Sequence, residues 1–242
     1  MGPMSRLIEQ ASPKAGRILD SARELALRHG VHKVTIAEIA AAAGVGKGTV
    51  YLYWETKEDL FVGLIAREVL AWLDDVGGRF DADRSLVLPR RFAPMLLRTT
   101  AGNPWLRWLR SDDSALARLM HRPEDRERFA EASPGAMGSA VLGILRERGV
   151  VRDDLPLPRQ MYALHALLVG FGLMMDQPDL AGGMNIADPD VALAEAVHLL
   201  LEPERDPSAK VVAEAAEAVR VRFGEIHDRL LAVVAAGAAG TR

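Results

Sequence analysis

The side chains that could do chemistry are concentrated between residues 35 and 61, in the sequence TIAEIAAAAGVGKGTVYLYWETKEDLF. The central part of this stretch, Lys47 to Leu52, carries a cation, hydroxyl groups and a glycine. Groups of these kinds form hydrogen bonds with phosphates and with base edges. A short polar helix that carries them on the outside of a packed unit fits the major groove of DNA.

Local signals predict how the first half of this stretch folds. Thr35 and Glu38 have the spacing of a capping box, which places a helix start at Thr35. Ile36 and Ile39 then recur at helical spacing and give that helix one apolar face. Gly44 suits the left-handed position that follows a helix end. We therefore expect a helix followed by a tight glycine turn.

The residues after this turn predict a second, shorter helix over 46–52, with Val50 as its inward residue. Gly46 is a weaker cap than Ser or Asp, so this helix starts less firmly. Thr56 and Asp59 repeat the cap pattern and start a longer helix. A helix, a glycine turn and a short second helix form the helix-turn-helix pattern, here over about 35–54, in which the second helix contacts base edges.

The stretch resembles the TetR (tetracycline-repressor-like) family of bacterial regulators. The resemblance covers roughly residues 12–65, and beyond them only the helical character and the length agree. Two positions depart from the family's pattern, because Trp54 stands where Phe is usual and Gly46 where Ser is common. The residues that carry the resemblance are Thr35, Ile36, Ile39, Ala40, Ala43, Gly44, Val45, Lys47, Gly48, Thr49, Val50, Tyr51, Tyr53, Lys57, Glu58, Asp59 and Leu60.

The polar residues of the motif have expected roles at the DNA. Lys47, Thr49 and Tyr51 would face the groove and its rim, although Tyr51 has an alternative interpretation as a packing residue. Gly48 would let the backbone approach closely. Thr35 and Tyr53 would contact a phosphate or set the helix, and Lys57 would pair with a phosphate. The full set expected to contact DNA is Thr35, Lys47, Gly48, Thr49, Tyr51, Tyr53 and Lys57.

Charge gives this interpretation no support, because the net charge of the 242-residue chain is −3. Residues 1–60 hold 8 Lys and Arg against 7 Asp and Glu, and the rest of the chain is acidic. A small DNA footprint needs only a few local cations. With few phosphates neutralised per subunit, we expect a modest salt dependence of binding. The candidate cations are Lys14, Arg17, Lys33, Lys47 and Lys57.

Composition narrows the remaining classes of protein. There is no Cys, which excludes a disulfide framework and a thiolate metal site. The chain has no phosphate-cradling Gly motif and no HExxH motif, so we expect no enzyme, no metal and no cofactor. The first ten residues lack the apolar core of a secretory signal, and we expect a cytoplasmic protein. The longest nearly apolar run, Met161 to Met175, is too short to span a membrane comfortably.

The rest of the chain predicts an all-α fold. We expect a three-helix DNA-binding domain over 1–58 and a larger helical ligand-binding and dimerisation domain over 59–242. A helix is expected to start at Ser12-Pro13 and to pack against the two helices of the helix-turn-helix. The fourth helix is expected over 57–76 and is broken by Gly77-Gly78. Further helices are predicted at about 84–100, 104–120, 123–132, 135–148, 158–176 and 189–202, with an extra C-terminal helix at about 208–236.

The segment 160–176 is apolar on nearly every side, and a helix of that kind has to be covered all round. One face can pack on its own domain and the other on a second subunit. Together with 189–202 it would form a two-fold interface of four helices, as the family resemblance implies. The alternative interpretation is the central helix of a monomeric bundle.

A ligand site is predicted more weakly than the DNA site. Several flexible apolar and aromatic residues with a few polar tips suit a small apolar or aromatic molecule, as ligand sites in helical bundles do. The same residues also suit a hydrophobic core. The candidates are Trp105, Trp108, Met120, His121, Met137, Tyr162, His165 and Phe171.

The residues and the resemblance together predict a DNA-binding transcriptional regulator. The expected form is a homodimeric repressor that binds a palindromic operator and leaves it when an unknown small molecule binds. Three alternatives stay open: a helical protein that binds DNA or a partner without a ligand switch, an activator, and a plain helical hairpin inside a bundle. The sequence identifies neither the operator and its genes nor the effector.

Overall fold

The computed structural model describes residues 12–103, 105, 130, 133–177, 179 and 186–239. Every regular element in these ranges is helical, which confirms the predicted all-α class. None of these helices combines the length and the hydrophobicity that a membrane span requires.

The chain forms two compact units. Unit 1 comprises residues 1–74, 104–132 and 225–242, and unit 2 comprises residues 75–103 and 133–224. Two long helices, α5 (Lys57–Ala82) and α13 (Ala209–Ala239), contribute residues to both units. The predicted domain boundary between residues 58 and 59 falls in the first turn of α5 and stays a prediction.

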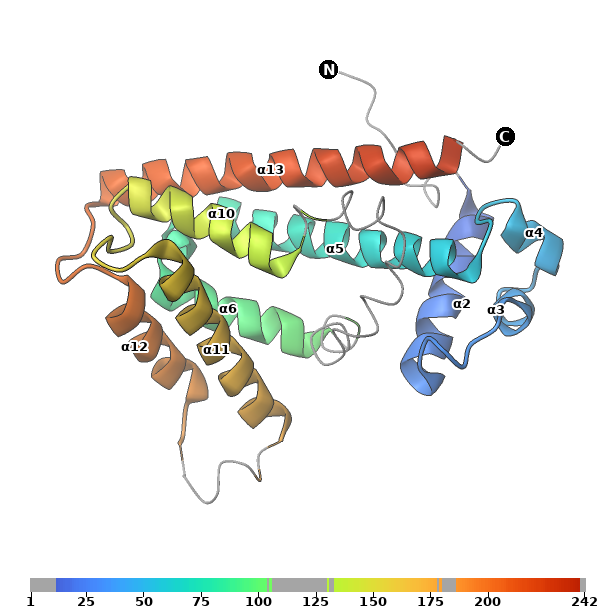
Figure 1. The fold of residues 1–242 in the computed structure, drawn as a ribbon, viewed down its shortest axis with the longest axis horizontal. Helices are drawn as coiled ribbons and strands as arrows, with labels where there is room; N and C mark the ends of the chain where they lie inside the picture. Colours follow the sequence, from blue (N-terminus) through green and yellow to red (C-terminus); the bar gives the residue numbers. More distant parts are fainter. Residues whose placement is uncertain are drawn as a thin grey trace. The chain divides into compact units, whose positions relative to one another are not determined.

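Unit 1 contains α2 (Pro13–His29), α3 (Ile36–Ala42) and α4 (Lys47–Tyr51), with α3 packed against both of the others (Figure 1). The first part of α5 completes the set. These helices share one hydrophobic core, which was expected from the apolar spacing in the sequence. Its fully buried members include Ile18, Ala22, Ile39, Val50, Leu60, Phe61 and Leu64.

The predicted helix ends of unit 1 are confirmed. The Ser12 hydroxyl accepts a hydrogen bond from the N–H of Ala15 at 3.4 Å at the start of α2. At α3, the N–H of Glu38 donates to the Thr35 hydroxyl, and the N–H of Thr35 donates to the Glu38 carboxylate at 2.8 Å. Gly44 has a φ of 66°, the left-handed conformation that the turn requires. Local signals alone therefore define the turn before α4.

Unit 2 contains η1 (Arg84–Val87), α6 (Pro89–Gly102), α10 (Pro134–Glu147), α11 (Leu157–Asp176) and α12 (Pro189–Leu201). α12 packs on α6 and on α11, and α11 also packs on α10. The predicted helix at 84–100 is a 3-10 turn followed by α6, which starts at a proline because the first helical position needs no N–H donor. The predicted helices at 104–120 and 123–132 lie outside the described residues, apart from positions 105 and 130.

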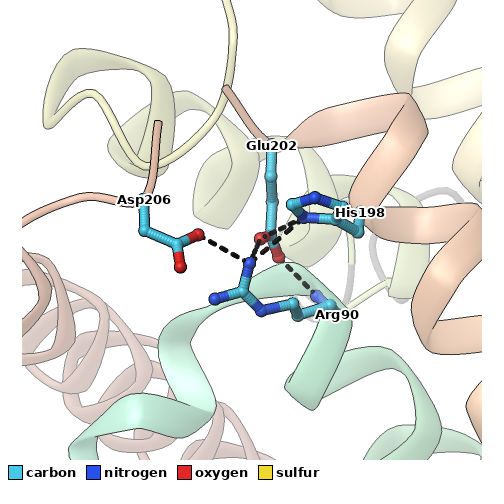
Figure 2. A network of polar contacts seen from close by, with 4 residues as sticks. All are labelled: Arg90, His198, Glu202 and Asp206. Carbon is cyan, nitrogen blue, oxygen red and sulfur yellow. Dashed lines mark hydrogen bonds and ion pairs between the residues drawn. The ribbon is translucent and has the colours of Figure 1, made fainter. Parts of the chain in front are cut away.

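A buried carboxylate joins α6 to α12 in unit 2 (Figure 2). Glu202 is 4% exposed and accepts hydrogen bonds from the backbone N–H of Arg90 and from its Nη1, both at 2.7 Å. Arg90 Nη1 also donates to Asp206 at 2.8 Å, and His198 Nδ1 lies 2.9 Å from Glu202. A buried charge is tolerated only when it is paired and hydrogen-bonded, and these contacts meet that condition.

One predicted helix end is wrong. α5 continues through Gly77 and Gly78 to Ala82, and neither glycine has a positive φ. Each glycine costs a helix about 1 kcal/mol relative to alanine. The fully buried Val76 and the 3%-exposed Phe80 extend the apolar stripe across this point. Their burial, worth about 1.5–3 kcal/mol each, outweighs the cost of the glycines.

Glu38 provides a test of the capping box through pH. The hydrogen bonds from Thr35 lower the pKa of the Glu38 carboxyl below its usual value of 4.5. Because folding lowers this pKa, the carboxylate stabilises the fold above pH 4.5, and the contribution is lost as the pH falls through the lowered pKa. We expect Glu38→Ala to reduce the thermal midpoint at pH 7, and the difference from the unmodified protein to shrink on acidification. A difference that stays constant with pH would contradict this role.

Candidate nucleic-acid interface

Two side chains that point into the core of unit 1 hold α4. Val50 is completely buried and Trp54 is 7% exposed. The N–H of Trp54 donates to the carbonyl of Val50 at 3.1 Å, so the helical turn continues beyond the end of α4. Gly46 caps α4 without a side-chain hydrogen bond, as predicted. Since a helix of five residues is unstable by itself, its position depends on this packing.

The outer face of α4 is open. Lys47 and Gly48 are exposed, Thr49 is half-buried, and Tyr51 keeps 50% of its surface exposed. A Cβ on Gly48 would meet no atom within 4 Å, so the fold itself does not require glycine there. The missing side chain leaves room for another surface to approach the backbone. Four of the seven predicted DNA-contact residues thus lie on one short helix.

Leu52 is a candidate that the sequence reasoning missed. It follows α4 directly and is 73% exposed, beside Tyr51. Its position two residues after the inward Val50 was the available signal, because two helical steps of about 100° lead to the opposite side. Apolar side chains on a helix that enters the major groove contact the methyl group of thymine, and Leu52 would suit such a contact.

Thr35 and Tyr53 hold the ends of neighbouring helices. The Thr35 hydroxyl donates to the Glu38 carboxylate at 2.8 Å. The Tyr53 hydroxyl lies 2.6 Å from the hydroxyl of Ser12, the cap of α2, so it connects the segment after α4 to the start of α2. Both residues set helix positions, which is one of the two roles expected of them. Their contact with phosphate stays a prediction.

Lys57 is also engaged within unit 1. Its Nζ donates to the carbonyls of Val31 and Val34 at 3.0 Å and to that of His32 at 3.3 Å. An ammonium group has three N–H donors, and these three acceptors use all of them. Lys57 therefore fixes the loop between α2 and α3. A phosphate contact of Nζ, as predicted from the sequence, would have to replace one of these bonds.

The other candidate cations are less constrained. Lys14, Arg17, Lys33 and Lys47 are exposed and form no ion pair with the described residues. By contrast, Arg67 pairs with Asp20 at 2.8 Å within the same unit. These four cations of the described residues are available to phosphates. This agrees with the modest salt dependence that we expect from the sequence.

The structure places the predicted ligand residues in different surroundings. Trp105 is 1% exposed and belongs to the core of unit 1. Met137 on α10 is buried in unit 2, whereas Phe171 on α11 is half-buried. Tyr162 (80% exposed) and His165 are exposed on α11. Trp108, Met120 and His121 lie outside the described residues, so the predicted ligand site stays a prediction.

Comparison with known proteins supports the helix-turn-helix. A family model described as bacterial regulatory proteins of the tetR family matches residues 18–64. The fatty acid metabolism regulator protein of Bacillus subtilis is 37% identical over 62 residues, which make up 26% of this chain and only 32% of that protein. An HTH-type transcriptional repressor of Streptomyces coelicolor is 27% identical over 158 residues, 62% of this chain and 74% of that protein.

A solved structure resembles this chain in fold over a longer stretch than the family match covers. The transcriptional regulator FadR from Bacillus subtilis, in complex with stearoyl-CoA, has a TM-score of 0.51 and 21% identity, and the match covers 76% of this chain and 96% of that one. At this identity the likeness concerns the fold alone. The family match covers most of α2, all of α3 and α4, and the first turns of α5. Residues 18–64 of the chain therefore match the tetR family of bacterial regulatory proteins in the part that forms the helix-turn-helix.

Trp54 and Gly63 form a pair whose coupling can be measured. A Cβ on Gly63 would lie 3.0 Å from Nε1 of Trp54, closer than ordinary packing permits. Alanine is otherwise worth about 1 kcal/mol more than glycine inside a helix, so we expect this contact to cancel that gain and Gly63→Ala not to stabilise the protein. Phenylalanine, which has no Nε1, should relieve the clash, so Gly63→Ala should stabilise the protein in a Trp54→Phe background. Chemical denaturation of the unmodified protein, the two single variants and the double variant measures the coupling between the two positions. Additive changes in the free energy of unfolding would contradict the contact.

Substitutions of Lys57 and Lys47 distinguish a lysine that stabilises the fold from a lysine that contacts a DNA phosphate. Lys57→Met removes three hydrogen bonds to carbonyls, so we expect a loss of stability of about 1–3 kcal/mol and weaker DNA binding with an unchanged salt slope. Lys47→Met should leave stability nearly unchanged and reduce the salt slope by about 1. Binding titrations at several salt concentrations give both slopes. A reduced slope for Lys57→Met would instead support the phosphate contact predicted from the sequence.

Proposed function

We propose that this protein is a sequence-specific DNA-binding transcriptional regulator that acts as a homodimeric repressor. One observation carries the proposal: α4 is anchored by Val50 while Lys47, Gly48 and Tyr51 remain open to the outside. A helix presented in this way has the geometry of the reading helix in a helix-turn-helix. Because its target DNA lies in the bacterial cytoplasm, the proposal also places the protein there.

The exposed apolar side chains of α11 and α12 support a dimer. On α11, Tyr162, Val169 and Leu173 recur at helical spacing and are 80%, 43% and 46% exposed. On α12, Val191 and Leu199 are 52% and 75% exposed. Apolar residues gathered on two neighbouring helices mark a protein interface more often than a water-facing surface. A second copy of the chain would cover them in a two-fold bundle of four helices, which fits the helices predicted from the sequence.

Dimerisation would determine both the form of the DNA site that the repressor binds and the way in which a ligand releases it. Two reading helices about one DNA turn apart contact a roughly palindromic site. A ligand that binds better to a conformation with a different spacing would release both contacts together. FadR of Bacillus subtilis was solved with stearoyl-CoA. For this chain we propose a small apolar or aromatic effector in the helical domain.

Each alternative function predicts a different experimental result. A helical protein without a ligand switch would hold its operator at saturating concentrations of every compound tested. An activator would raise transcription from a reporter that carries the recovered site, whereas a repressor would lower it.

The proposal is tested by recovering DNA from fragmented genomic DNA of the source organism. We expect the unmodified protein to enrich a few fragments that share a near-palindrome. A Lys47→Ala/Tyr51→Ala variant should lose the enrichment, since it removes the contacts of α4 without touching the buried Val50. A circular dichroism spectrum and a thermal midpoint equal to those of the unmodified protein show that the variant is folded.

A further variant tests the proposed dimer in the same DNA-recovery experiment. Leu199→Glu places a charge in the proposed interface, which should give monomers and weaken recovery of the palindrome. Val221→Glu is the control, because Val221 is 47% exposed but lies on α13. Equal enrichment by the unmodified protein and the Lys47→Ala/Tyr51→Ala variant would overturn the proposed use of α4. Full recovery by a monomeric Leu199→Glu would overturn the dimer alone.

A further inference from the structure

The exposed apolar faces of α11 and α12 each carry one titratable side chain near the middle of the helix. On α11, His165 is exposed within the apolar stripe described above. On α12, Glu195 is exposed between Val191 and Leu199 and lies four residues from each. Residues four apart in a helix share one face. A dimer that covers these faces therefore also covers an imidazole and a carboxylate.

Neither of these two side chains is engaged within its own chain. His165 and Glu195 form no hydrogen bond and no ion pair with the residues that the structure describes. By contrast, the other carboxylate of α12, Asp190, pairs with Arg98 of α6. A carboxylate that is taken out of water without gaining a hydrogen-bond donor is strongly unfavourable. Once its face is covered, Glu195 therefore requires a donor from the second copy.

His165 and Glu195 lie at similar heights along the pair of helices. The Nε2 of Gln160 donates to the carbonyl of Arg152 at 2.8 Å, and the N–H of Arg152 donates to the carbonyl of Leu201 at 2.8 Å. These bonds place the start of α11 beside the end of α12, so the two packed helices run antiparallel (Figure 1). His165 follows Gln160 by five residues and Glu195 precedes Leu201 by six, which correspond to rises of about 7.5 and 9 Å.

A two-fold axis can relate two such pairs of helices in two ways. If the axis runs parallel to the helices, every residue keeps its height and α11 faces α12 of the second copy, which brings His165 opposite Glu195 of that copy. If the axis crosses the helices at this height, each helix lies on its own copy and two carboxylates face each other. Two carboxylates repel, whereas an imidazole has an N–H to donate in either protonation state. Hydrogen bonding and charge therefore both favour the first arrangement.

We propose that His165 of each chain donates a hydrogen bond to Glu195 of a second copy, and that this reciprocal pair sets which helix faces which in the dimer. The pair occurs twice, because a two-fold interface uses the same surface of both subunits. In coiled coils, single polar residues within an apolar seam fix register and partner in the same way. The inference rests on the dimer of the proposed function and adds its orientation.

Subunit exchange between two full-length variants, His165→Glu and Glu195→Arg, tests the pair. The homodimer of either variant lacks both favourable pairs. The mixed dimer regains both, because the introduced glutamate meets the introduced arginine and His165 meets Glu195. We expect an exchange constant about tenfold above the random value, measured by native mass spectrometry of differently tagged chains. Both positions are exposed in the single chain, so neither substitution disturbs the core of unit 2.

Two further mixtures serve as controls. Glu195→Arg mixed with the unmodified protein should exchange at random, because the mixed dimer keeps one of the two pairs and so lies midway between the homodimers. A preference for this mixed dimer would show that Glu195 faces its own copy and would overturn the proposal. Lys210→Glu mixed with Glu214→Arg is the matched control, since Lys210 and Glu214 pair within one chain on α13. This mixture should also exchange at random.

Random exchange between His165→Glu and Glu195→Arg, or a mixture of the two that stays monomeric, would overturn the pair. If Leu199→Glu is monomeric in that case, the dimer through α11 and α12 stands without the pair. A dimeric Leu199→Glu would place the interface elsewhere and would overturn both the pair and the proposed dimer. A preferred mixed dimer, together with random exchange in both controls, supports the pair.

Discussion

The structure depends on the burial of one side of a helix too short to be stable alone. α4 has five residues, and its inward Val50 has no exposed surface. The free energy needed to nucleate a helix exceeds the free energy gained from a single hydrogen-bonded turn. The stability of α4 therefore comes from its packing on the core of unit 1. The outer residues of α4 are thereby presented in a fixed orientation. DNA binding would gain from this, because the backbone of α4 is already ordered before binding.

Other interactions in unit 1 maintain that core around α4. The Tyr53 hydroxyl contacts Ser12 at the start of α2, and the three hydrogen bonds of Lys57 fix the loop that leads into α3. Trp54 fits because Gly63 has no side chain. The departure from the usual Phe is therefore explained within this chain: a larger ring is accommodated by a small residue on α5.

The sequence predicted what depends on local signals and missed what depends on distant contacts. The capping box of Thr35, the left-handed Gly44 and the inward Val50 follow from spacing within a few residues, and all are confirmed. The continuation of α5 through Gly77-Gly78 was missed because the burial of Phe80 depends on Phe92 and Phe223, whose rings lie 5.6 and 6.0 Å away. The carbonyl contacts of Lys57 join residues more than twenty positions apart, and no local pattern signals them.

In the proposed repressor, two copies of α4 contact one operator. Hydroxyl-radical footprinting of a recovered operator fragment tests it most directly. We expect two protected stretches per strand, related by two-fold symmetry and centred about 10 base pairs apart or a multiple of that distance. A single protected stretch, or protection that does not depend on the position of the palindrome, would contradict it.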